Sequence, residues 1–271
     1  MSLVVAWTSA DDKPEGKSLS AIYFGADSQY TEYSDQHVVL NKRRQEKKVW
    51  AVKNYPDIFA LFGDVYYPRK IMDLLVESIE TGGLYHPDEL ASEKMNLVSN
   101  RIKVLLKGVS CEAFNILFAT RDECGFSLCE YVFDGFLLKR EIHPLPPSSS
   151  VVLAKGSGEK DFNKRWVYDY SSRTNEFGTC RAVYHCLAKT IQETTQEAVG
   201  GAPQLVGLYR GGNSRAFGIL KGDKTYLYGV ETGPDDITTS IEWRNDSFER
   251  IDPYRLKLLD GAKAQPFAMD L

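Results

Sequence analysis

Two pairs of helix-like segments interrupt a chain that otherwise consists of short strand-like segments. The first pair covers residues 67–83 and 86–108, and the second covers about 160–172 and 179–198. In the first segment, apolar residues recur at the spacing of one helix face and end before a Gly-Gly pair. Because every sheet face and helix stripe must be buried against another layer, we predict an α+β, four-layer αββα sandwich of two antiparallel sheets flanked by helix pairs.

The opening quarter of the chain predicts two β-hairpins. The first joins "LVVAWT" (3–8) to "SLSAIYFGAD" (18–27), and the second joins "KKVWAV" (47–52) to "IFALFGD" (58–64). The last forty or so residues show little periodicity. We therefore expect one domain over residues 1–235 and a C-terminal extension, residues 236–271, packed on the same domain.

The charge and the cysteine content exclude several classes of protein. A net charge of −4 argues against a general polyanion binder. No window approaches the roughly 18 apolar residues that cross a bilayer. The five cysteines are scattered, and Cys180, His185 and Cys186 lack a second ligand pair at metal-binding spacing. We expect a cytoplasmic protein with free thiols, no metal, no cofactor and no membrane segment.

Several polar residues beside the predicted strands fit either a structural or a chemical role. Asp27 and Ser28 are typical of a hydrogen-bonding turn. Lys48 ends the basic run "KRRQEKK", which is typical of a solvated face. A nucleic-acid patch on that run is a further interpretation, which the acidic chain disfavours. Gly63 and Ser157 fit turns, and the phosphate-binding pattern G-x-x-x-x-G-K-[ST] is absent around Ser157.

The order of these pieces resembles the proteasome-type N-terminal nucleophile (Ntn) hydrolases, which include proteasome β-subunits and the peptidase subunit of the bacterial two-component ATP-dependent protease. That family opens with a nucleophile on a short apolar strand, a returning strand ending in D-S-x-x-T and a K-K-V strand start. A glycine after an apolar strand and a G-S-G turn follow. The matching pieces, within about residues 2–230, are "SLVVAW", "ADSQYT", "EKKVWAV", "ALFGD" and "KGSGEKD". The resemblance implies catalytic positions at Ser2, Asp27, Lys48, Gly63 and Ser157, and a substrate-binding position at Thr31.

The resemblance also implies how these residues work together. Ser2 would be the nucleophile and, through a free α-amine with a pKa of about 7.7–8, its own base. Lys48 would favour negative charge on the serine oxygen, and Asp27 would hold Lys48 ionised. The N–H of Gly63 would stabilise an oxyanion, and Thr31 would bind the substrate backbone as an added strand. The implied activity is cleavage of peptide or amide bonds in a homo-oligomer such as a ring, with an ATPase partner.

The chain departs from the family pattern in ways that favour a second hypothesis. The nucleophile is a serine where β-subunits have a threonine, and Met1 must be removed to free its amine; if the first residues are vector-derived, that serine is not native. Gln196 and Val199 stand where the family has an Asp and a Ser that support the amine, and Glu193 or Glu197 could substitute for them. The alternative is a catalytically inactive proteasome-like subunit with an assembly or partner-binding role.

Overall fold

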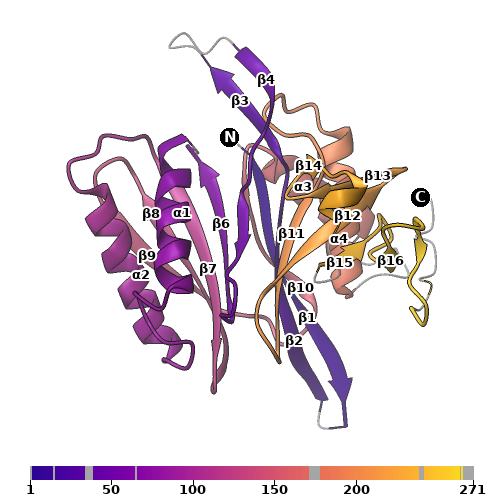
Figure 1. Cartoon of the computed structure of the whole chain (residues 1–271), viewed down its shortest axis with the longest axis horizontal. Helices are drawn as coiled ribbons and strands as arrows, with labels where there is room; N and C mark the ends of the chain where they lie inside the picture. Colours follow the sequence, from indigo (N-terminus) through magenta and orange to yellow (C-terminus); the bar gives the residue numbers. More distant parts are fainter. Residues whose placement is uncertain are drawn as a thin grey trace.

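Two β-sheets face each other across a shared apolar interior (Figure 1). The computed structural model describes residues 2–14, 16–33, 39–64, 66–170, 178–237, 241–262 and 264, with the backbone alone for 32–33, 39–44 and 234. None of the helices in this part of the chain is both long and apolar enough to span a bilayer.

The smaller sheet is an antiparallel meander that carries two helices on its outer face. It runs in the order β5 (Val49–Ala51), β6 (Asp57–Gly63), β7 (Phe114–Asp122), β8 (Gly125–Phe133) and β9 (Leu138–His143). The helices α1 (Tyr66–Glu80) and α2 (Ala91–Leu106) pack against it through Ile71, Leu75 and Ile102, which join Phe59 and Phe118 in one apolar cluster. The sequence periodicity predicts these three residues, but it also places Leu74 and Leu90 in the stripes, and those two are 45% and 43% exposed. The helix α2 begins at Ala91 and not at Pro87.

The larger sheet has ten strands and is mixed. Its main path is β10 (Ser150–Gly156), β1 (Leu3–Lys13), β2 (Gly16–Ala26), β11 (Gln204–Tyr209), β12 (Arg215–Lys221), β15 (Glu242–Arg244), β16 (Arg250–Asp252) and β17 (Lys257–Leu258). The short strands β13 (Lys224–Leu227) and β14 (Val230–Glu231) extend from β12, and a 3₁₀ turn spans Pro234–Asp236. The helix α3 (Glu159–Arg165) runs into a π-helical turn (Trp166–Tyr170), and α4 (Cys180–Glu193) lies on β1 and β2.

Strand β1 is buried on both faces, which explains its unbroken apolar run. Side chains alternate across a strand, so Val4 and Ala6 face the smaller sheet while Val5 and Trp7 face α4. On the neighbouring strand, Gly25 allows the helix to approach closely, because a Cβ there would lie 2.4 Å from the Leu187 side chain. The start of β1, and with it Ser2, is therefore held firmly between layers.

The predicted fold class is wrong. Strand residues make up about 40% of the chain and helical residues about 25%. The larger sheet is not antiparallel, because β15 runs parallel to β12. Within the described residues its two helices are also not a matched pair, since α3 has seven residues and α4 has fourteen. The prediction failed because the short strands after residue 240 have no periodicity of their own and form only by pairing, β15 with β12 and each later strand with the one before it.

A two-stranded ribbon connects the end of β2 to the start of β5. It consists of β3 (Gln29–Tyr33) and β4 (Val39–Gln45), and it projects beyond the sheets at the same end as the N-terminus (Figure 1). The side chains at 42–44 lie outside the described residues, so the nucleic-acid interpretation of the basic run stays a prediction.

Candidate active site

Asp27 lies where the first two strands of the chain meet. It follows β2 directly, and its backbone N–H donates to the carbonyl of Leu3 at 3.1 Å. In return, Asp27 Oδ1 accepts the backbone N–H of Leu3 at 2.8 Å. The Asp27 side chain is completely buried. The carboxylate therefore fixes the peptide bond that joins Ser2 to Leu3.

Both oxygens of the Asp27 carboxylate are fully used. Oδ1 also accepts from the ammonium of Lys48 at 2.7 Å. Oδ2 accepts the N–H groups of Gln29, at 3.1 Å, and Gly200, at 3.2 Å. A carboxylate offers about four acceptor sites, and four donors occupy them here. The bond from Gln29 is the turn that the sequence favours, so Asp27 serves the turn and the ion pair together.

Lys48 is a buried cation with one donor to spare. Its side chain is 1% exposed, although the basic run that it ends is typical of a solvated face. Nζ donates to Asp27 and to the carbonyl oxygen of Gln29 at 2.8 Å. An ammonium has three donors, and within the described part of the chain one of them remains. Burial lowers the pKa of Lys48 below its ordinary 10.5, while the neighbouring Asp27 opposes that shift.

Ser2 has an unpartnered hydroxyl in the same region. Its side chain is buried, and among the described residues Oγ has no hydrogen-bond partner. The Ser2 carbonyl accepts from Ser157 Oγ and from the Gly158 N–H, each at 3.4 Å. Gly156 has a φ of +98°, and a Cβ there would lie 2.1 Å from the Ser2 oxygen. The close approach of this turn to the Ser2 carbonyl therefore requires glycine at position 156.

Gly63 and Thr31 lie on two different strands that border the cluster of Ser2, Asp27 and Lys48. The Leu61 N–H donates to the Lys48 carbonyl at 2.8 Å, so Gly63, two residues further along β6, lies at the same end of the sheet as Lys48. Thr31 is 6% exposed, and its hydroxyl donates to the Glu197 carbonyl at 3.3 Å. Its side chain anchors a loop, and its predicted backbone contact with substrate stays a prediction.

Sequence reasoning missed two residues that complete the cluster. Gln204 is buried, its Oε1 accepts the Lys48 N–H at 2.9 Å, and its Nε2 donates to the carbonyls of Asp27, at 3.2 Å, and Glu46, at 2.6 Å. Gly200 accepts the N–H groups of Ser28 and Gln29 through its carbonyl. The sequence signal that could have identified Gln204 is its position, as a polar residue directly before the apolar run "LVGLY".

The acids considered as substitutes for amine support have other contacts. Glu193, at the end of α4, forms an ion pair with Arg165 at 2.7 Å. The Glu197 carbonyl accepts from the side chains of Gln29 and Thr31. The loop that carries Glu197 therefore binds the turn after β2 mainly through backbone groups.

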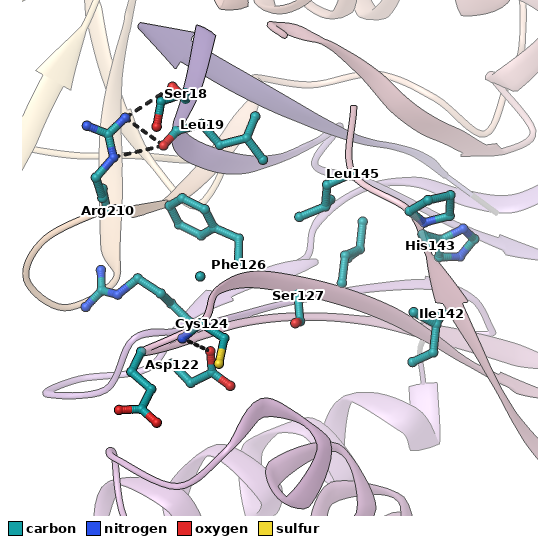
Figure 2. A pocket seen from close by; sticks show the side chains of 15 residues that line it. Ser18, Leu19, Asp122, Cys124, Phe126, Ser127, Ile142, His143, Leu145 and Arg210 are labelled. Carbon is teal, nitrogen blue, oxygen red and sulfur yellow. Dashed lines mark hydrogen bonds between the residues drawn. The ribbon is translucent and has the colours of Figure 1, made fainter. Parts of the chain in front are cut away.

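A separate pocket of about 660 Å³ lies at the other end of the sheets, between the β7–β8 turn and the β1–β2 hairpin (Figure 2). It lies roughly 25 Å from Asp27 along β2, at about 3.3 Å per residue. Arg210 donates to the carbonyls of Ser18 and Leu19, and the Cys124 N–H donates to Asp122. These polar groups are bonded to one another, and His143, which also lines the pocket, contacts Glu130 at 3.1 Å.

No family model matches the chain, and no curated protein sequence matches it either.

Proposed function

We propose that this protein is an Ntn-type hydrolase that cleaves peptide or amide bonds through Ser2 after Met1 has been removed. The observation that carries the proposal is the shared oxygen of Asp27. One atom, Oδ1, accepts from the ammonium of Lys48 and from the N–H of Leu3, so the cation and the first peptide bond of Ser2 are held together. An unpartnered serine hydroxyl and a spare ammonium donor are the two groups that such a reaction needs.

The reaction begins at the serine oxygen. The free α-amine of Ser2 accepts the hydroxyl proton, since its pKa is about 7.7–8. The oxygen attacks the substrate carbonyl, and the ammonium of Lys48 favours the negative charge at Oγ. The tetrahedral intermediate then expels the amine, which takes the proton from the α-amine. Water hydrolyses the resulting acyl-Ser2 ester and regenerates the enzyme. A backbone N–H at Gly63 is the proposed oxyanion donor.

A second candidate function is a catalytically inactive subunit that keeps this cluster for stability. Its specific support is burial, because Ser2 and Asp27 are 0% exposed and Lys48 is 1% exposed. A substrate carbonyl cannot reach a hydroxyl in that state. The active hypothesis requires that release of Met1 opens a path to Ser2, whereas the inactive one requires no such path.

The test is covalent labelling with a peptide β-lactone, followed by peptide mapping. We expect wild-type protein to gain one acyl group on Ser2, and Ser2→Ala to gain none. Ser2→Thr is the matched variant that retains a hydroxyl, and it should still be labelled. Thr8→Ser, on the same strand, serves as the control and should be labelled like the wild type. Labelling that persists in Ser2→Ala would exclude the proposed nucleophile.

The family resemblance further supports assembly into a homo-oligomer and, at greater remove, an ATPase partner. Light scattering on the purified chain tests the first of these, and a mass equal to a single 30.6 kDa chain would contradict it.

A further inference from the structure

The C-terminal strands bring three arginines around one carboxylate. Arg215 lies on β12, Arg244 on β15 and Arg250 on β16, and all three form ion pairs with Glu242. The closest ion pair is that of Arg244, whereas Arg215 and Arg250 lie 3.7 Å and 3.9 Å from the carboxylate oxygens. Those two distances exceed a hydrogen bond. One acid thus balances one arginine and leaves about two positive charges in excess.

Strand register makes this excess unfavourable for the chain alone. Arg244 and Arg250 are direct partners across the antiparallel β15–β16 pair, so their side chains share one face of the sheet. Like charges directly opposite each other destabilise a strand pair. The nearby Asp252 does not cancel the excess, because it pairs with Arg255 at 3.6 Å. An arrangement with this penalty is stabilised when an anion binds.

A pocket lies beside these charges. It has a volume of about 400 Å³ and is lined by Arg215, Glu242 and Arg250 together with the apolar surfaces of Trp243, Pro253 and Tyr254. The arginines at its wall are accessible, since the side chains of Arg215 and Arg250 are 53% exposed. Their guanidinium groups can therefore meet a molecule that enters from solvent.

An unused donor lies in the same wall. Trp243 is 2% exposed, and within the described part of the chain its indole N–H has no hydrogen-bond partner. Buried N–H groups nearly always have an acceptor, supplied by protein, water or ligand. The pocket therefore combines spare cationic charge, a free donor and apolar surface.

We propose that this pocket binds a small organic anion, in which a phosphate or carboxylate head group is joined to an apolar or aromatic body. Guanidinium groups fit both head groups, because their planar N–H pairs match two oxygens at once. The head group would contact Arg215 and Arg250, and the body would lie against Trp243 and Tyr254. This site is independent of the Ser2 cluster and of the function proposed for it.

Calorimetric titration of the full chain tests the proposal with phenyl phosphate, benzoate, inorganic phosphate and phenol. We expect saturable binding of phenyl phosphate or benzoate, weaker binding of inorganic phosphate and none of phenol, and the tighter of the first two identifies the head group. Arg250→Gln and Arg215→Gln should each weaken binding by about tenfold, as expected for a charge-assisted hydrogen bond. The matched control, Arg140→Gln on β9, should bind like the wild type.

Glu242→Gln best distinguishes an anion-binding role of these arginines from a purely structural one. Removing the competing carboxylate should tighten binding of the anion, by about tenfold at low salt. Arg250→Gln should also keep or raise the melting temperature of the ligand-free protein, because it removes a like-charge pair. Absence of saturable binding to both aromatic anions, or binding unchanged in Arg250→Gln, would overturn the proposal.

Discussion

The molecule contains two buried clusters in which a lysine lies near an aspartate, one in each sheet, and they differ in what they contact. In the larger sheet, Asp27 bonds the Lys48 ammonium directly. In the smaller sheet, Asp57 accepts from the Tyr85 hydroxyl at 3.0 Å, and the charge of Lys94 lowers its pKa while burial raises it more strongly. The Lys94 ammonium itself donates to the backbone carbonyls of Pro87 and Arg121.

The difference lies in the neighbours and not in the burial. Asp57 and Lys94 are both 0% exposed, as buried as Asp27 and Lys48. The cluster of Asp57 and Lys94 connects β6 to the chain around α2, which is a structural task. The cluster of Asp27 and Lys48 contacts the peptide bond of Ser2 and leaves one ammonium donor unused, and the Ser2 hydroxyl has no partner among the described residues. A buried ion pair alone therefore does not indicate catalysis, and the contact with the peptide bond of Ser2 is what distinguishes the pair of Asp27 and Lys48.

The largest expected effect separates the two lysines by activity. Lys48→Met should reduce the rate of Ser2 labelling by about 10²-fold or more, the range for removal of a positioned proton-handling group. Lys94→Met should leave labelling of the folded protein unchanged. Mass spectrometry of the β-lactone adduct over time measures both rates. An equal loss of labelling rate in the two variants would show that both lysines act only by stabilising the fold.

The same variants should also lose stability. Removing one member of a buried charged pair costs about 3–5 kcal/mol, because it leaves an uncompensated charge. Denaturant unfolding of Lys48→Met and Lys94→Met measures this loss. Substitution of a surface lysine would cause almost no loss of unfolding free energy. The same small loss in Lys48→Met would contradict the burial of Lys48.

A double variant sharpens the comparison by separating charge from catalysis. Asp27→Asn combined with Lys48→Met should recover about 1–3 kcal/mol relative to the sum of the single variants, since the uncompensated carboxylate is gone. The amide still has an oxygen that can accept from the Leu3 N–H. Labelling should stay absent despite the recovered stability. If labelling returns with stability, Lys48 has no chemical role.

Gln204 offers a smaller test of the network around Lys48. Gln204→Leu leaves the backbone N–H of Lys48 and two carbonyls without this partner, and each buried unsatisfied group costs about 1–3 kcal/mol. We expect lower stability by urea unfolding and a reduced rate of Ser2 labelling. Gln204→Glu, which retains acceptors but no amide donors, is the matched variant. Wild-type stability in Gln204→Leu would contradict the observed network.

The smallest effects are slopes of stability with pH, and they have opposite signs. Burial raises the pKa of Asp57 above its ordinary 3.8, so the folded chain holds this proton more tightly than the unfolded chain. The stability that Asp57 contributes to the folded chain is present below pH 3.8 and declines as the pH rises to the raised pKa. Burial lowers the pKa of Lys48 below 10.5, so stability increases as the pH rises from that lowered pKa to 10.5.

Unfolding midpoints across pH measure both slopes. Asp57→Asn should flatten the decline on the acidic side, and Lys48→Met should flatten the rise on the alkaline side. A wild-type profile with the same slopes as the variants would contradict these assignments.

The sequence predicted those parts of the molecule whose cause is local. The hairpin of β1 and β2 follows from two long apolar runs around a turn, and α1 follows from a stripe that ends at a Gly-Gly pair. The nearness of Asp27 and Lys48 was predicted from the resemblance, through the order of motifs along the chain. For the hairpin and for α1, a few neighbouring residues determine the outcome.

Long-range contacts account for what was missed. Lys48 is buried although its neighbours are basic, because the residue after it, Val49, begins β5 of the smaller sheet and packs against the larger sheet. Gln204 reaches Lys48 across 156 positions of sequence, which no local pattern reports. The strands β15–β17 have two or three residues each, and they add to the sheet in sequence, β15 on β12, β16 on β15 and β17 on β16, so the mixed sheet could not be read from periodicity.

The most direct test of the central claim is the intact mass of the untagged protein before and after treatment with the peptide β-lactone. Our account predicts a chain that begins at Ser2 and gains the mass of one acyl group on that residue. A native chain that retains Met1, or a Met1-free chain that gains no mass, would contradict Ser2 as the nucleophile.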